Sequence, residues 1–288
     1  MRKMRFGLLA VIPALIFVLL SKCDQVRAQN TPQAAGAEEV TFPSGGLTLH
    51  GFIYRPAGDG RFPIVVWNHG SERLPGWLPE LGQFFVRRGY VFFVPHRRGQ
   101  GRSASAGPYI MDALRQEGSE RGAQARSAKL VEMMEVHLQD QLAALEFART
   151  LPYVDADRIA VMGCSFGGIQ TLLAAESAPG IRVAVDFAGG AESWESSPDL
   201  RNRMLVAARR AKVPVLFVQA QGDYDLSPSK ELAKEMDREG KQHEMRIYPA
   251  VGKTHQENHE FCIHGSAIWG SDVMEFVEKE FKTAETVQ

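Results

Sequence analysis

The sequence predicts an α/β protein built on a mostly parallel, eight-stranded sheet with helices on both faces and an antiparallel hairpin at the N-terminal edge. Along most of the chain, short apolar runs typical of buried strands alternate with longer amphipathic segments typical of helices. The first two strand-like segments are separated only by Pro43-Ser44-Gly45-Gly46, a turn sequence. Strands joined by a tight turn pair antiparallel, whereas strands joined through a helix pair in parallel.

Each predicted strand and helix has its own sequence pattern. The β-rich segments 40–42 and 47–54 form the hairpin, and the apolar run Phe62–Trp67 is the next strand. A helix at Leu78–Arg88 ends at Gly89, and a strand follows at Tyr90–Pro95. The later strands are predicted at Arg158–Cys164, Ile181–Phe187, Val213–Ala220 and His243–Tyr248, and the later helices at Ser127–Thr150, 167–175, Leu200–Arg210, Pro228–Gly240 and Ser266–Phe281.

The chain is predicted to contain one folded domain preceded by an export signal. A basic start, an apolar run too short for a comfortable membrane span and small residues up to Ala28 are typical of a cleaved signal peptide at residues 1–28. Residues 29–38 are polar and small, which predicts a disordered leader. The domain then covers residues 39–288, with a small polar insertion at 104–126 predicted as a loop or short helix. The protein is therefore expected to be periplasmic or secreted, without a membrane span after cleavage near Ala28.

The charge and the cysteine content of the chain bear on its binding partners and on disulfide formation. The 288 residues carry a net charge of −1, so nothing in the charge balance favours nucleic-acid binding. Cys164 and Cys262 are the cysteines left after signal cleavage, and an oxidising compartment permits them to pair, although the sequence leaves the pairing open. The oligomeric state is open as well.

The strongest functional pattern is Gly163-Cys164-Ser165-Phe166-Gly167, which lies between a predicted strand and a predicted helix. This G-x-S-x-G spacing is typical of a nucleophile elbow, a strained turn that exposes a serine hydroxyl. The flanking glycines remove Cβ atoms that would collide at the turn. The following helix start presents backbone N–H groups to a developing oxyanion.

Three further strand ends supply candidate partners for Ser165. After the strand at 62–67, the loop Asn68-His69-Gly70-Ser71 is expected to donate the Ser71 N–H to an oxyanion hole, together with the N–H of Phe166. A serine–histidine pair also needs a carboxylate. The segment Gly222-Asp223-Tyr224-Asp225 offers two: Asp225 is favoured because it directly precedes a helix start, and Asp223 is the reserve, with a turn-holding role otherwise.

The base is expected from the segment after the last strand, because the order serine, aspartate, histidine is that of G-x-S-x-G hydrolases. His259 and His255 compete for this role, and His264 is a more distant candidate. Three arginines, Arg97, Arg98 and Arg102, follow another strand and either brace their loop or bind a substrate carboxylate.

The chain resembles the α/β-hydrolase superfamily and, within it, the dienelactone-hydrolase-like branch. The resemblance covers residues 40–282 and depends on Asn68-His69-Gly70, the segment 96–103, the elbow, Gly222-x-x-Asp225, the segment from Tyr248-Pro249 to His259, and Trp269-Gly270. It implies that His259 is the base and His255 the reserve. Dienelactone hydrolases proper carry a cysteine nucleophile, whereas this elbow carries Ser165, with Cys164 one position earlier.

These patterns predict a serine hydrolase that cleaves small carboxylic esters or lactones through an acyl-enzyme, without a cofactor or metal. An exopeptidase or amidase using the same triad is one alternative. A metal-dependent hydrolase using His255, His259, Cys262 and His264 is a second, because their spacing resembles that of metal ligands. A non-catalytic binding protein on the same fold is a third.

Overall fold

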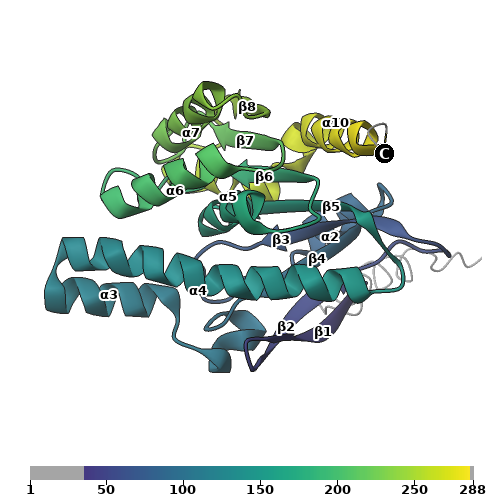
Figure 1. Cartoon of the computed structure of the whole chain (residues 1–288), viewed down its shortest axis with the longest axis horizontal. Helices are drawn as coiled ribbons and strands as arrows, with labels where there is room; N and C mark the ends of the chain where they lie inside the picture. The colour runs from purple at the N-terminus through teal and green to yellow at the C-terminus, as the bar shows by residue number, and fades with distance from the viewer. Residues whose placement is uncertain (1–35, 286–288) are drawn as a thin grey trace, which may run out of the picture.

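The computed structural model describes residues 36–285. Its strands form one eight-stranded sheet in the order β1-β2-β4-β3-β5-β6-β7-β8 (Figure 1). The strands are β1 (Ala37–Ser44), β2 (Leu47–Tyr54), β3 (Phe62–Asn68), β4 (Val91–His96), β5 (Val154–Cys164), β6 (Val183–Phe187), β7 (Val215–Ala220) and β8 (His243–Tyr248). The helices are α2 (Pro79–Val86), η1 (Gly101–Ala106), α3 (Ile110–Arg121), α4 (Ala123–Thr150), α5 (Phe166–Ser177), α6 (Pro198–Arg210), α7 (Ser227–Arg238), α8 (His255–His259), α9 (Phe261–His264) and α10 (Ser266–Glu285). The predicted fold class is confirmed.

The N-terminal hairpin forms as the turn sequence predicts. β1 and β2 pair antiparallel across Gly45 and Gly46, whose φ angles of 51° and 82° favour glycine. Strand β1 begins at Ala37, which is buried, so the predicted leader at 29–38 is wrong at its last two residues. Residues 29–35 of that leader and the predicted signal peptide at 1–28 lie outside the described residues.

The sheet changes its winding direction at β3. Strand β4 pairs in parallel on one side of β3, and β5 pairs in parallel on the other side. The chain therefore leaves β3 toward one edge and returns to continue toward the other. Open sheets of this kind form their binding crevice beyond the carboxyl ends of the strands at such a switch point. The loop after β3, the loop after β4 and the turn after β5 all meet there.

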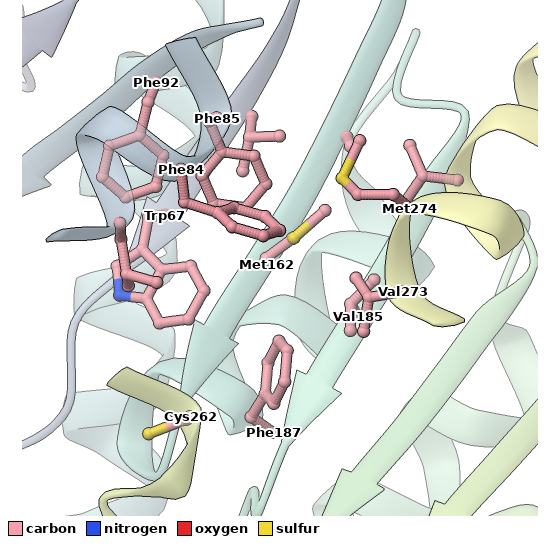
Figure 2. Packing of buried hydrophobic residues seen from close by; sticks show 14 of the residues in the cluster. Trp67, Phe84, Phe85, Phe92, Met162, Val185, Phe187, Cys262, Val273 and Met274 are labelled. Carbon is pink, nitrogen blue, oxygen red and sulfur yellow. The ribbon is translucent and has the colours of Figure 1, made fainter. Parts of the chain in front are cut away.

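Helices cover both faces of the sheet. Helices α4, α5, α6 and α7 pack on one face, and α2, α9 and α10 pack on the other (Figure 1). The second face is rich in aromatic residues, and Figure 2 shows Trp67, Phe85 and Phe92 packed together. The Phe85 and Phe92 rings stack with centroids 5.0 Å apart. Such pairs add about 1 kcal/mol beyond their buried area and make the sheet a rigid support for its strand ends.

The insertion at 104–126 is more helical than the sequence predicts. Helix α3 runs antiparallel along the first half of α4, and the break between them falls at Gly122, whose φ is 87° (Figure 1). Only Ile110 and Leu114 of α3 are buried, so its apolar stripe is too sparse to stand out among polar residues. None of the helices within residues 36–285 combines the length and the apolar character needed to cross a membrane.

Candidate active site

Ser165 occupies the sharp turn between β5 and α5. Its φ of 58° and ψ of −119° lie in a region that costs energy for a residue with a Cβ, and its N–H donates to Phe187 O at 2.8 Å. The neighbouring glycines are required by space. A Cβ on Gly167 would lie 1.9 Å from Asn68 O, and one on Gly163 would lie 2.3 Å from Gly167 O. The loop after β3 and the start of α5 are therefore in direct contact, as the G-x-S-x-G spacing predicts.

His259 and Asp223 form a buried pair. Asp223 Oδ1 accepts a hydrogen bond from His259 Nδ1 at 2.8 Å, and the two residues are 6% and 5% exposed. The same carboxylate accepts from the N–H of Tyr224 at 2.7 Å and from the side-chain amide of Gln219 at 2.9 Å. Because the imidazole is the donor toward Asp223, the proton of the neutral ring is on Nδ1 and the lone pair is on Nε2.

Asp225, the carboxylate that the sequence favours, does not contact His259. Its Oδ1 accepts from the Ser227 N–H at 2.8 Å, at the start of α7. The preference for Asp225 over Asp223 is therefore wrong as a matter of geometry. A helix does begin next to Asp225, as the sequence predicts. The Asp225 carboxylate turns to this helix start instead of to His259, because the first N–H groups of a helix lack partners inside it.

The electrostatics of His259 favour a proton acceptor. Burial lowers the pKa of the imidazole, but the hydrogen bond and the charge of Asp223 outweigh burial and raise the pKa above its usual value. His259 Nε2 is buried and makes no hydrogen bond within residues 36–285. A buried nitrogen with an unused lone pair is suited to accept a hydroxyl proton.

Helix α8 positions His259 at its last residue. Thr254 and Glu257 form a capping box at the start of this helix, in which Glu257 N–H donates to Thr254 Oγ1 at 3.2 Å. Asn258 is buried and ties down the preceding loop, since its side chain accepts from Val251 N–H at 2.8 Å and donates to Thr254 O at 2.7 Å. Sequence reasoning missed Asn258, although a Thr-x-x-Glu pattern directly before it signals a helix start.

A disulfide joins the elbow to the histidine segment. Cys164 and Cys262 are bonded, with their Cα atoms 5.9 Å apart. Cys164 directly precedes Ser165, and Cys262 lies in α9, which follows α8. Both sulfur atoms lie near the carbonyl oxygen of His259, at 3.8 and 3.4 Å. The pairing that the sequence left open thus links the residue before Ser165 covalently to the third residue after His259.

The expected oxyanion donors, Ser71 and Phe166, both line a cavity beside Ser165. This cavity of about 230 Å³ is bounded by apolar side chains of α3, α4 and α5 (Ile110, Leu114, Leu130 and Ile169) and by the charged side chains of Arg126 and Glu192. The N–H of Phe166 is the first of α5 and has no partner inside the helix. A Cβ on Gly70, the residue before Ser71, would lie 3.5 Å from Ser165 Cβ. The Ser71 loop therefore adjoins the serine.

The remaining histidine candidates lie apart from this pair. His255 is exposed, with its Nδ1 2.9 Å from Gly222 O and its ring stacked on Tyr224. His264 is exposed beside Glu80. Cys262 is used by the disulfide, and no three histidine, cysteine or acidic side chains in the described part of the chain cluster as metal ligands.

The arginines after β4 brace loops in this structure. Arg97 is buried and bonds the loop after β3. Arg98 forms a bidentate pair with buried Asp140. Arg102 is exposed and pairs with Glu39.

Comparisons with known proteins identify the family of this chain. A model described as the dienelactone hydrolase family matches residues 50–266. The chain is 31% identical to a "probable 2-oxo-3-(5-oxofuran-2-ylidene)propanoate lactonase" from Bradyrhizobium over 223 residues, which are 76% of this chain and 84% of the relative. It is 28% identical over 149 residues to the quorum-quenching protein AidA from Acinetobacter baumannii, which is 51% of this chain but 41% of AidA.

Solved structures share the fold at low identity. A protein described as a dienelactone hydrolase from Klebsiella pneumoniae superposes with a TM-score of 0.60 at 20% identity, over 85% of this chain and 98% of the other. An acylaminoacyl peptidase from Pyrococcus horikoshii superposes with a TM-score of 0.62 at 20% identity, over 85% of this chain and 41% of the peptidase. At this identity, the similarity shows a shared fold and does not indicate a substrate.

Proposed function

Because this chain belongs to the dienelactone hydrolase family, we propose that it is a serine hydrolase that cleaves carboxylic esters or lactones of small substrates through an acyl-enzyme. One observation carries the proposal. His259 donates from Nδ1 to Asp223 and keeps an unbonded, buried Nε2 in a segment joined by a disulfide to the residue before Ser165. These groups supply a nucleophile, a base and a group that orients the base.

In the proposed reaction, Ser165 Oγ attacks the ester carbonyl carbon while His259 Nε2 takes the hydroxyl proton. Asp223 holds the imidazole in the required tautomer and stabilises the imidazolium that forms. The N–H groups of Ser71 and Phe166 bind the tetrahedral oxyanion. The imidazolium gives its proton to the departing alkoxide, which leaves as an alcohol. Water, deprotonated by His259, then releases the acid.

The cavity beside Ser165 supports a small, apolar acyl group. Its volume of about 230 Å³ and the apolar part of its lining, Ile110, Leu114 and Leu130, suit a short hydrocarbon or a ring, while Arg126 and Glu192 on the same wall suit a polar substituent. An exopeptidase or amidase would use the same three residues, so the assay compares p-nitrophenyl esters, a simple lactone and aminoacyl p-nitroanilides. We expect turnover of esters and lactones to exceed that of anilides.

The buried disulfide supports export as part of this proposal. Disulfides persist in secreted and periplasmic proteins, whereas cytosolic thiols are kept reduced. Export through the predicted signal at residues 1–28 would deliver Cys164 and Cys262 to such an oxidising compartment. The expected location is tested by fractionating cells that express the full chain.

Substitution of Ser165 by alanine tests the proposed function. The variant should lose about 10⁶-fold in ester turnover, because it lacks the attacking oxygen. Ser177→Ala, at the last residue of the same helix, is the matched control and should retain full activity. Ester turnover by Ser165→Ala within tenfold of the unmodified protein would rule out this nucleophile.

A further inference from the structure

The carbonyl oxygen of Gly70 receives three hydrogen bonds from buried side chains. Arg97 Nη2 donates to it at 2.7 Å, and Gln100 Nε2 donates at 3.2 Å. The third partner is His69 Nδ1, at 3.0 Å. Most carbonyl oxygens accept one or two hydrogen bonds. This carbonyl is therefore unusually polarised, and one of its donors is a cation.

The tautomer of His69 fits this arrangement. Its Nε2 accepts from the Arg97 backbone N–H at 3.3 Å, which assigns the ring proton to Nδ1, and Nδ1 lies 3.0 Å from both Gly70 O and Arg97 Nη2. Burial and the charge of Arg97 lower the pKa of His69 well below its usual value, which keeps the ring neutral. His69 therefore acts as a fixed donor to the loop.

Arg97 is a buried cation that has no carboxylate within ion-pair distance among residues 36–285, although the charges of Glu72 and Asp140 act on it. It is 2% exposed, and no acidic side chain of residues 36–285 forms an ion pair with it. Burial lowers the pKa of its guanidinium to about 10, so it stays protonated at neutral pH. Its Nη2 bonds the carbonyls of His69 and Gly70, both at 2.7 Å. Arg97 therefore brings a positive charge and two short hydrogen bonds to neighbouring carbonyls of this loop.

The carbonyls of the whole loop are held in the same way. Tyr109 Oη donates to Ser71 O at 2.8 Å, and Gln100 Nε2 donates to Glu72 O at 2.7 Å. Side chains thus bind the carbonyl oxygens of residues 69 to 72, one after another. The Ser71 N–H, in contrast, has no hydrogen-bond partner within residues 36–285. The loop is fixed through its carbonyls, which leaves this amide proton available.

The carbonyl of Gly70 and the N–H of Ser71 belong to one amide, and the peptide bond is trans. In a trans amide the two groups point in opposite directions, so fixing the carbonyl fixes the direction of the N–H. A donor at the carbonyl also strengthens the N–H of the same amide as a donor. We propose that Arg97, helped by Gln100, is a positioning residue that aims and polarises the Gly70–Ser71 amide, so that Ser71 N–H stabilises the oxyanion. This inference rests on the proposed function.

The test compares Arg97→Met, Arg97→Lys and Gln100→Leu with the control Arg88→Met. Arg88 also donates to a backbone carbonyl, Phe84 O at 3.0 Å, but it lies two residues after the end of α2 and away from the site. The measurements are kcat and KM for a p-nitrophenyl ester and the affinity for a trifluoromethyl ketone. The serine oxygen adds to the ketone carbonyl carbon and forms a tetrahedral oxyanion, which the same amide would bind.

We expect Arg97→Met to lower kcat by roughly 10- to 100-fold, less than the loss of a whole oxyanion donor, with KM changed less than about threefold. Affinity for the ketone should fall by a similar factor. Arg97→Lys should recover part of both losses because it keeps the charge, and Gln100→Leu should lower both by about fivefold. Arg88→Met should match the unmodified protein.

A fall in kcat without a fall in ketone affinity would overturn the inference, as would unchanged kcat in Arg97→Met. If Arg97→Met does not fold, Gln100→Leu decides: unchanged kcat and ketone affinity in that variant would also overturn it. Failure of the proposed function is a separate result, because it shows as activity that survives Ser165→Ala.

Discussion

At the scale of single residues, two aspartates separated by one position have different roles. The chain directs Asp223 back across the sheet end toward His259, while Asp225 turns to the first N–H groups of α7. Both carboxylates accept backbone N–H groups, so the turn-holding role predicted for Asp223 exists alongside its contact with His259. The two aspartates differ in the 2.8 Å hydrogen bond from His259 Nδ1, which Asp223 accepts and Asp225 does not.

Asparagine substitutions at these positions test the assignment. Asp223→Asn should lower kcat by about 10⁴-fold, because an amide favours the wrong tautomer of His259. Asp225→Asn should change kcat less than about threefold and lower the free energy of unfolding by about 1 kcal/mol, through a weaker helix start. Steady-state kinetics and urea denaturation measure the two effects. The opposite ranking of the two variants would return the role to Asp225.

The pH profile of kcat/KM gives an independent readout of the same substitution. His259 acts as a base only when neutral, so activity rises with pH through the pKa of its imidazole. Asp223 raises this pKa above the usual value near 6.5, which places the acid limb above that pH. In Asp223→Asn only burial and more distant charges remain, and we expect the limb to move to lower pH.

At the scale of elements, the disulfide replaces part of the packing that would otherwise hold α8 and α9 against β5. These helices are short, and helices of this length have little stability of their own. The Cys164–Cys262 bond closes a loop across a sequence separation of 98 residues and is buried on both sides. Its main effect is therefore to restrict the unfolded chain and to keep the histidine segment at the elbow.

Replacement of both cysteines by alanine should lower the free energy of unfolding by about 4 kcal/mol, given this loop length. The measurement is urea denaturation, followed by tryptophan fluorescence. Unmodified protein with its disulfide reduced is the control and should agree with the double variant within about 1 kcal/mol. A loss below about 1 kcal/mol would show that packing alone holds these helices.

At the scale of the whole molecule, the sheet was predictable because it depends on patterns that a sequence displays. Alternating apolar runs and helices indicate parallel strands, and the carboxyl ends of such strands converge. Ser165 directly follows β5 and Ser71 lies in the loop after β3, whereas His259 lies further from its strand, at the end of α8. Helix α3 was not predictable, because only Ile110 and Leu114 of its residues are buried.

The contacts that refine the site depend on side-chain directions, which a sequence does not display. The choice of Asp223 over Asp225 depends on which way a turn faces. The role of Arg97 depends on the approach of its guanidinium to the Gly70 carbonyl from the end of β4, the strand that neighbours β3 in the sheet. The disulfide depends on the distance between Cys164 and Cys262, which only the fold sets.

Covalent labelling with a fluorophosphonate tests most directly the claim that Ser165 is the nucleophile. Phosphonylation requires a serine hydroxyl activated by its base, and trypsin releases Ser165 in the peptide Ile159–Arg182 after reduction. Tandem mass spectrometry should locate a single adduct on Ser165 in the unmodified protein and none in His259→Ala. An adduct on Ser177 or on another residue, or undiminished ester turnover by fully phosphonylated protein, would contradict the account.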